Sequence, residues 1–388
     1  MSQAVEKASD IVGFELLSHV DFDGLGDCMQ ILENRDHIYV GHMGYNGIGT
    51  SVIDVSDKRA PKIVRQIPIP ENTHSHKVQL ANDVLLVNHE QQLHAGFPHS
   101  AGLKLYDISS PADPVEIGWL PIDGLGIHRM WWTGDDLTYF SVRENGFQGR
   151  FLMSADISDP SKPEIVARWW YPGQWTAGGE TPTWEKGPTL RAHHAIAVGD
   201  RAYAGWGEGG LLIFDISDRE IELIAQKEWF SEIGQSTHTH TALPLPSHKT
   251  VAVTDEPLRD NPEPYRKRAR MFDISDEKNP SLLGYFPEPQ EADYGQVPLR
   301  FGPHNIHENR PGSWVSDDLL FMTYFSAGLR VYDVSNPADI REVGRFVPPA
   351  PQGQDAIQLN DVYASAEGIV YVSDRLTGGV YILQYTGT

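Results

Sequence analysis

Short apolar runs alternating with clusters of turn-forming residues extend along nearly the whole chain. One such run recurs six times and ends in Asp-Val-Ser or Asp-Ile-Ser, at Asp54, Asp107, Asp156, Asp215, Asp273 and Asp333. A seventh run, GVYILQY from Gly379, has Ile382 in place of the Asp. The successive spacings are 53, 49, 59, 58, 60 and 49 residues. A spacing this regular predicts a repeat architecture.

Each repeat contains four short β-rich runs. The apolar strand is followed by the Asp-x-Ser turn and by a second strand such as VEIGWLPI, and two more runs, such as HKVQLA and VLLVNH, precede it. Asp and Ser side chains close such turns by bonding nearby backbone amides. Helical periodicity is nearly absent. Four strands repeated at this spacing are typical of a propeller blade. We therefore predict an all-β fold, a seven-bladed β-propeller with blades of four antiparallel strands.

The repeat predicts one domain that covers residues 1–388. Its expected blades are 24–70, 71–122, 123–172, 173–230, 231–288, 289–348 and 349–388 plus 11–23. The last repeat ends with its third strand, whereas the segment GFELLSHVDF precedes the first blade. This N-terminal strand is expected to join the C-terminal blade and close the ring, which removes an exposed sheet edge.

The Asp-Val/Ile-Ser turns, with Pro following, resemble the LVIVD-repeat family, which is itself interpreted as a seven-bladed propeller. The resemblance covers nearly the whole chain. It implies the architecture and says little about activity.

Histidines gather where the first strand of each repeat begins. In a propeller this strand lines the central channel, so equivalent residues converge on the axis. Allowing a one-residue slip, the equivalent residues are Asp27, His76, His128, His194, His240, His304 and Asp361. Neutral imidazoles suit transition metals, whereas Ca²⁺ would require a carboxylate-rich ring. The sequence therefore predicts one divalent transition metal, with iron favoured and zinc, manganese or copper as alternatives, and with the ligands His76, His128, His194, His240 and His304.

Other polar residues are expected beside this ring. His193 is one residue away, so strand alternation predicts that it faces the other way and supports the site. The ends of the second strands return to the same face, where the expected catalytic residues are Glu90, Glu144, Glu208, Glu256, Asp255 and Tyr324. The expected substrate-binding residues are His74, His238, His307, Trp206, Asp27 and Asp361. Long aromatic-bearing insertions near the same face suggest a covered apolar or aromatic substrate.

The net charge of -22 argues against nucleic acid and anionic membranes as partners. No signal peptide or apolar membrane segment is visible, and the chain has one cysteine, Cys28. These features predict a cytoplasmic protein whose partner is a small-molecule substrate. The oligomeric state stays open.

Three functions remain open at this point. The first is oxidative, oxygenase-type conversion of a small apolar or aromatic substrate at the axial metal. It draws on a distant architectural similarity to histidine-ligated propeller metalloenzymes, namely the carotenoid cleavage oxygenases and the selenium-binding/methanethiol oxidase proteins. The second is a metal-dependent hydrolase or lyase that uses the ion as a Lewis acid. The third is a non-catalytic interaction propeller.

Overall fold

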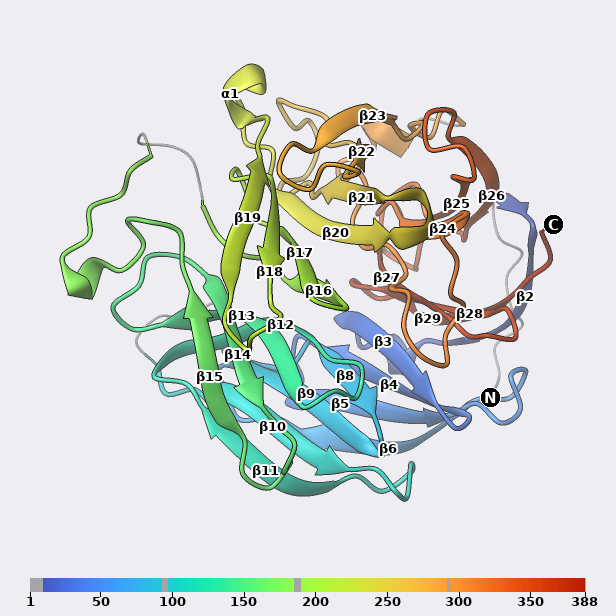
Figure 1. The fold of residues 1–388 in the computed structure, drawn as a ribbon. Helices are drawn as coiled ribbons and strands as arrows, with labels where there is room; N and C mark the ends of the chain where they lie inside the picture. Colours follow the sequence, from blue (N-terminus) through green and yellow to red (C-terminus); the bar gives the residue numbers. More distant parts are fainter. Residues whose placement is uncertain (1–9, 93–96, 185–189, 292–293, 388) are drawn as a thin grey trace.

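Antiparallel sheets stand around a common centre, and their first strands converge on it (Figure 1). The computed structural model describes residues 10–92, 97–184, 190–291 and 294–387. Within a unit, each strand pairs with the next strand along the chain, as in the order β3-β4-β5-β6. The prediction of an all-β propeller is therefore confirmed.

The strands of the first three units are β3 (Cys28–Asn34), β4 (His37–His42), β5 (Ile48–Asp54) and β6 (Lys62–Pro68); β7 (Thr73–His74), β8 (Val78–Ala81), β9 (Val84–Gln91), β10 (Gly102–Asp107) and β11 (Val115–Pro121); and β12 (Gly124–Trp131), β13 (Leu137–Glu144), β14 (Phe151–Asp156) and β15 (Glu164–Trp169). The next units comprise β16 (Ala195–Val198), β17 (Arg201–Gly205), β18 (Leu211–Asp215) and β19 (Glu222–Lys227); and β20 (Thr239–Leu245), β21 (Thr250–Asp255), β22 (Ala269–Asp273) and β23 (Ser281–Tyr285). The remaining strands are β24 (Leu319–Thr323), β25 (Leu329–Asp333), β26 (Arg341–Val347), β27 (Leu359–Ala364), β28 (Ile369–Asp374) and β29 (Gly379–Tyr385).

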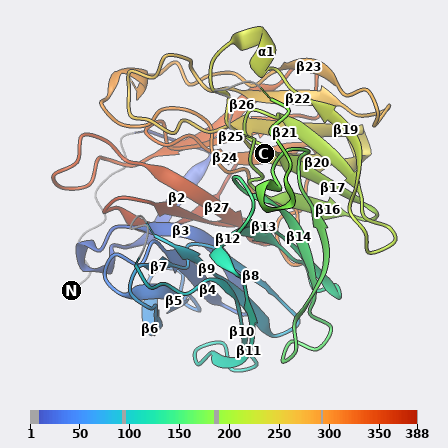
Figure 2. The same cartoon turned by 90° about the vertical axis from the view of Figure 1, so that its left-hand side faces the viewer.

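Short helical turns lie in the connections between strands. They are η1 (Phe22–Gly24), η2 (Thr176–Gly178), α1 (Phe230–Ile233), η3 (Pro246–His248) and η4 (Tyr294–Gln296). In both views α1 lies at the outer edge of the molecule (Figure 2). No helix in the described ranges has the length and apolar composition needed to cross a membrane.

One link merges two units into a single sheet. β9 pairs with β12 through Glu90 and Gly126, so the strands β8–β11 and β12–β15 belong to one hydrogen-bonded sheet. A Cβ atom on Gly126 would lie 2.2 Å from the carbonyl oxygen of His89, so a side chain at this position would prevent the close approach. Because of this merger the number of blades stays a prediction.

The N-terminal segment closes the ring in two places. β2 (Phe14–Val20) pairs with β29, as predicted. In addition, β1 (Asp10–Val12) pairs with β26 of the preceding unit, a second closure that the sequence pattern did not predict. Both pairings cover strand edges that would otherwise be free.

The Asp-x-Ser turns take the predicted form. In the six repeats that have this turn, the Asp carboxylate accepts a hydrogen bond from the backbone N–H of the Ser two residues later, for example Asp54 from Ser56 at 2.9 Å and Asp273 from Ser275 at 2.7 Å. These bonds hold the pKa of Asp54 and Asp273 below the ordinary value. Each turn thus reverses the chain between the third and fourth strands of its unit.

A second recurring contact joins each unit to the next at the centre. Side chains of the second strand donate hydrogen bonds to backbone carbonyls of the next innermost segment: Asn88 to Ile127 (2.7 Å), Ser141 to His193, Thr254 to His304 (2.7 Å), Thr323 to Asn360 (3.0 Å) and Ser373 to Met29 (2.6 Å). Glycine occupies the equivalent position twice. A Cβ on Gly41 would lie 2.6 Å from the carbonyl carbon of His76, and one on Gly205 would lie 2.3 Å from the carbonyl oxygen of His240. These contacts fix the backbone that carries the central histidines.

Apolar packing between neighbouring sheets supports this arrangement. One buried cluster joins Leu86 of β9, Phe140 of β13 and Phe214 of β18, each of them fully buried. Burying one such side chain contributes about 1.5–3 kcal/mol relative to leaving it exposed.

Candidate metal centre on the propeller axis

Six histidine rings follow one another around the centre of the molecule. Their consecutive centroids are 4.3, 4.9, 5.0, 3.5 and 4.3 Å apart. We call this set the histidine arc; in order, it consists of His74, His76, His128, His193, His240 and His304. All are buried except His128, which is partly exposed. The arc thus brings together side chains from successive innermost segments.

Burial keeps most of these imidazoles neutral. It is the first cause that lowers the pKa of His76, His128, His193 and His240 well below the ordinary value, and it lowers the pKa of His304 to about 3. A neutral imidazole has one nitrogen lone pair free to bind a metal or accept a proton.

One end of the arc has two imidazoles facing one carboxylate. The Nε2 atom of His304 lies 3.5 Å from Oε1 of Glu256, and Nε2 of His240 lies 3.8 Å from its Oε2. The Nδ1–H of His304 donates to the carbonyl oxygen of Asn360 at 2.6 Å, which leaves the Nε2 lone pair facing Glu256. The three ligand atoms all lie within 4.8 Å of one another. Two histidines and one carboxylate are a donor set that non-haem iron and zinc sites use.

Glu256 is ionised in this setting. Burial raises its pKa, but His304, the hydrogen bond to His238 and the neighbouring His240 outweigh burial and hold the pKa well below the ordinary value. Arg300 also contacts it, with Nη1 at 3.2 Å from Oε1.

The other end of the arc is a hydrogen-bonded group around Glu90. Its Oε2 accepts from Nε2 of His74 at 2.9 Å and from Nδ1 of His128 at 2.7 Å. His76 completes a second group with His74 and Glu90 in which the ligand atoms lie within 4.8 Å. The Nδ1 atom of His76 accepts from the Asn88 amide at 3.3 Å, which places its proton on Nε2. Glu90 therefore orients two imidazoles, while the lone pairs at this end are less available than those at Glu256.

Two ring nitrogens of the arc are fully buried without a hydrogen-bond partner among the described residues. They are Nε2 of His240 and Nδ1 of His74, and both are buried. A buried polar atom left unpaired costs about 1–3 kcal/mol. A metal ion at the Glu256 end would bind the first of these atoms, so the donor set there fits a divalent transition metal.

The alignment of the seven repeats within the sequence predicted three ring residues, His194, Asp27 and Asp361, that are not members of the arc. His193, not His194, lies between His128 and His240, while the ring of His194 is 6.4 Å from that of His240. The expectation that His193 faces away is wrong, because β16 begins only at Ala195 and residues 190–194 do not follow strand alternation.

The same slip applies to both predicted aspartates. The inter-unit contacts described above are made by the carbonyls of Met29 and Asn360, which lie two residues after Asp27 and one residue before Asp361. Asp27 accepts from His42 at 2.8 Å at the edge of the first unit.

A buried charged layer lies directly beyond the arc. Arg129 pairs with Glu308 and lies 3.3 Å from Asp361, whose Oδ2 is 4.0 Å from Nζ of Lys77. His194 belongs to this layer, because its Nε2 is 3.4 Å from Glu308. Burial lowers the pKa of Lys77 to about 7, with Arg129 as the next cause, and burial lowers the pKa of His194 to about 4.

Some predicted catalytic residues do not reach the arc. Asp255 is saturated by Arg270, the indole N–H of Trp229 (3.2 Å) and the hydroxyl of Thr239 (3.1 Å). Glu144 is bound by Arg168 at 3.2 Å. Tyr324 is buried in the apolar core, where burial raises its pKa far above the ordinary value. These three side chains have structural partners because strand ends also lie between neighbouring sheets.

The remaining predicted residues divide between the site and the core. His238 is close to the site, with Nε2 at 3.4 Å from Glu256, and Glu208 accepts from Ser236 nearby. Trp206 is fully buried and packs edge-on against Trp169. His307 accepts from the Ala364 N–H at 3.2 Å and donates to the Trp314 carbonyl at 2.9 Å, so it joins two segments of backbone.

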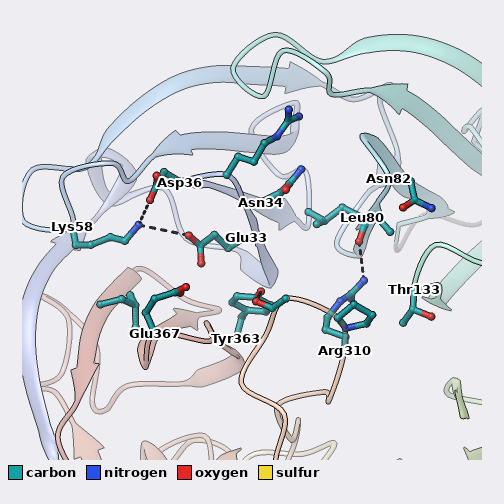
Figure 3. Close-up of a pocket in the computed structure, with 15 residues that line it drawn as sticks. Glu33, Asn34, Asp36, Lys58, Leu80, Asn82, Thr133, Arg310, Tyr363 and Glu367 are labelled. Atoms are coloured by element: carbon teal, nitrogen blue, oxygen red, sulfur yellow. Dashed lines mark hydrogen bonds and ion pairs between the residues drawn. The ribbon is translucent and has the colours of Figure 1, made fainter.

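The structure also contains a pocket of about 600 Å³ at the opposite ends of the innermost strands (Figure 3). Its lining includes Glu33, Lys58, Arg310 and Tyr363. Arg310 donates to the Leu80 carbonyl at 3.0 Å and lies 4.0 Å from Glu308 of the charged layer. The charged layer thus lies between this pocket and the histidine arc. Because the pocket contains none of the histidines, we do not assign the metal chemistry to it.

Sequence reasoning missed several residues around the arc. Lys77 and Arg129 directly follow His76 and His128, and Asn305 follows His304, so a polar residue after three of the ring histidines was a recurring signal. Phe325 was also missed; its ring lies 4.7 Å from that of His304. Nothing in the sequence pattern marked Phe325, because it comes near His304 only through the packing of two segments.

Four-stranded sheets around a histidine-lined axis define a β-propeller with a candidate metal centre. Two segments of this propeller, residues 192–219 and 313–347, match the LVIVD repeat. No curated protein matches the chain.

Three solved structures illustrate the similarity of fold. The β-propeller domain of Cps50 (Swd1) from Myceliophteria thermophila is 13% identical with a TM-score of 0.58, covering 96% of this chain and 99% of that one. A hypothetical selenium-binding protein from Sulfolobus tokodaii is 15% identical with a TM-score of 0.55, covering 98% and 92%. Sqt1 from Saccharomyces cerevisiae is 9% identical with a TM-score of 0.55, covering 97% and 88%. At these identities the likenesses show the fold alone.

Proposed function

We propose that this protein is a metal-dependent enzyme whose ion is held by His240, His304 and Glu256. The observation that carries the proposal is the convergence of two neutral imidazole nitrogens on one ionised carboxylate, with His240 Nε2 buried and unpaired. A scaffold for protein partners has no need of this arrangement.

The proposed reaction is an oxidative conversion of a small organic molecule. Divalent iron, which two histidines and a carboxylate suit, would supply redox chemistry with O₂. Phe325 packs on His304 and offers an apolar surface beside the site, which supports a substrate with an apolar or aromatic part.

The protein's own groups would position the substrate and handle protons. Glu90, which already accepts hydrogen bonds from His74 and His128, can receive a proton relayed through either imidazole. Arg300 fixes the carboxylate of Glu256, and the Asn360 carbonyl fixes the tautomer of His304.

Elemental analysis of anaerobically purified protein tests the proposal. We expect about one equivalent of iron per chain, and loss of that iron in both Glu256→Gln and His304→Gln. His37→Gln is the matched control, because His37 lies at the start of β4 and its Nδ1 contacts the carbonyl oxygen of the neighbouring Arg35 at 2.9 Å. Nitric oxide, a substitute for O₂ that gives an electron paramagnetic resonance signal with ferrous sites, reports whether a coordination position is open.

Two results would count against the proposal. Wild-type protein that binds neither iron, zinc, manganese nor copper would exclude the metal centre. Stoichiometric zinc, lost in the same two variants, would replace the redox reaction with Lewis-acid hydrolysis or elimination.

A further inference from the structure

Arginines gather around the histidine arc, in contrast to the acidic chain as a whole. They are Arg143, Arg150, Arg191, Arg300 and Arg375. The Arg143 side chain is 39% exposed, and its Nε lies 3.9 Å from Oε1 of Glu90. The chain carries a net charge of -22, so a group of five cations at its centre is a local reversal of charge.

Arg150 is a buried cation beside the arc. It is 4% exposed, its Nε is buried without a hydrogen-bond partner, and it forms no ion pair with another described residue. It lies beside the arc, because its carbonyl accepts from the Ala192 N–H at 3.0 Å and its charge is the first influence after burial that lowers the pKa of His128. An unpaired buried guanidinium is costly to maintain without a ligand.

Two further arginines lie over the aromatic ring beside His304. The guanidinium carbon of Arg300 is 5.8 Å from the Phe325 ring centre, and that of Arg375 is 5.9 Å from it. Arg300 is paired with Glu256, whereas Arg375 forms no ion pair among the described residues. A ligand that packs on Phe325 would therefore contact Arg375, which is available for an ion pair with it.

The arginines converge on one region. Burial lowers the pKa of Arg150, Arg191 and Arg375, and in each case the charge of Glu256 acts in the opposite direction. Contacts agree with this: Arg300 lies 3.2 Å from Glu256, and Nη2 of Arg191 lies 3.3 Å from Nδ1 of His238, whose Nε2 is 3.4 Å from Glu256.

We propose that the ligand of this site carries an oxyanion group, a carboxylate or a phosphate, and that Arg150 and Arg375 bind it beside the histidine arc. Guanidinium groups form two parallel hydrogen bonds with such groups, and neutral ligands would leave Arg150 unpaired. The inference deepens the proposed function, because it names the charge of the substrate at the same site. The apolar part of that substrate would contact Phe325.

Calorimetric titration with three probes of similar size tests the proposal. The probes are benzoate, phenyl phosphate and the uncharged benzyl alcohol, each added to metal-free and to metal-loaded protein. We expect one of the two anions to bind at least tenfold more tightly than benzyl alcohol. The tighter anion identifies the group as carboxylate or phosphate.

Two variants and a control locate the binding. Arg150→Met removes a cation that has no ion-pair partner, and Arg375→Gln tests the second arginine independently of whether the first variant folds. Each is expected to weaken anion binding at least tenfold with benzyl alcohol unaffected. Arg59→Gln is the control, since Arg59 is 62% exposed and pairs with Glu15 far from the arc.

Equal binding of anions and alcohol, or unchanged anion binding in the folded variants, would overturn the inference. Its failure can be told from failure of the metal centre. Metal binding without selective anion binding refutes this inference alone, whereas anion binding by a protein that takes up no metal refutes the proposed enzyme and leaves the anion site standing.

Discussion

Replacing His307 by Gln should make the protein less sensitive to acid. Both ring nitrogens of His307 are occupied: Nδ1 accepts from the Ala364 N–H and Nε2–H donates to the Trp314 carbonyl. Only the neutral ring can make this pair of bonds. A Gln amide offers the same two functions, one acceptor and one donor, without a titratable group.

The magnitude follows from the pKa of this side chain. Burial lowers the pKa of His307 from 6.5 to about 4. As the pH falls below 6.5 the unfolded chain binds a proton at this position while the folded chain does not, so stability is lost between about pH 6.5 and pH 4. One pKa unit corresponds to about 1.4 kcal/mol. Between pH 7.5 and pH 5, His307 alone should therefore remove about 2 kcal/mol of the free energy of unfolding.

Urea unfolding of both proteins at pH 7.5 and pH 5 measures this quantity. We expect similar stabilities at pH 7.5, and at pH 5 a free energy of unfolding about 2 kcal/mol higher for His307→Gln than for the wild type. His194 and His304 titrate in the same way in both proteins, so their contribution cancels. An equal loss in wild type and variant would refute the assignment of His307 as a neutral link between two backbone segments.

Three further predictions concern the metal, the charged layer and the ring closure. Ferrous iron at 100 times its dissociation constant should stabilise the folded protein by about 2.7 kcal/mol, which for 388 residues raises the melting temperature by about 3 °C. Anaerobic thermal scans measure this rise, and Glu256→Gln should abolish it. Arg129→Leu leaves Glu308 and Asp361 without their buried partner, so urea unfolding should show a free energy of unfolding about 3–5 kcal/mol lower than that of the wild type. A decrease below about 1 kcal/mol would mean that this pairing does not stabilise the charged layer. Deletion of residues 1–20 removes β1 and β2 and exposes the edges of β26 and β29, so size-exclusion chromatography should show higher oligomers or aggregates, whereas a monodisperse, unchanged elution volume would contradict the closure.

The repeat pattern was sufficient to predict the class of fold. The spacing of the Asp-x-Ser turns and the alternating apolar runs define a four-stranded unit through local interactions, and local interactions can be inferred from neighbouring residues. The bond from each Ser amide to the Asp two residues earlier spans one turn, as at Asp107, where the distance is 2.7 Å. The pairing of β2 with β29 was also predictable, because a propeller with a three-stranded last blade has one free edge to cover.

The register of the central residues could not be obtained in this way. Strand alternation was applied to residues 190–194, which are not in a strand, so His193 and His194 were exchanged. The contact from Ser141 to the His193 carbonyl fixes this segment, and Ser141 lies 52 residues before His193 in the sequence.

The sequence by itself determined that this chain is a propeller with histidines near its axis, because repeats and strand patterns are local properties. Only the tertiary structure decided that His240, His304 and Glu256 converge and that Asp255 and Tyr324 are buried among structural partners. It also decided that the buried Nε of Arg150 has no hydrogen-bond partner among the described residues. These properties arise where segments distant in sequence come together, and there burial and the nearest charges set the protonation state and partners of each side chain.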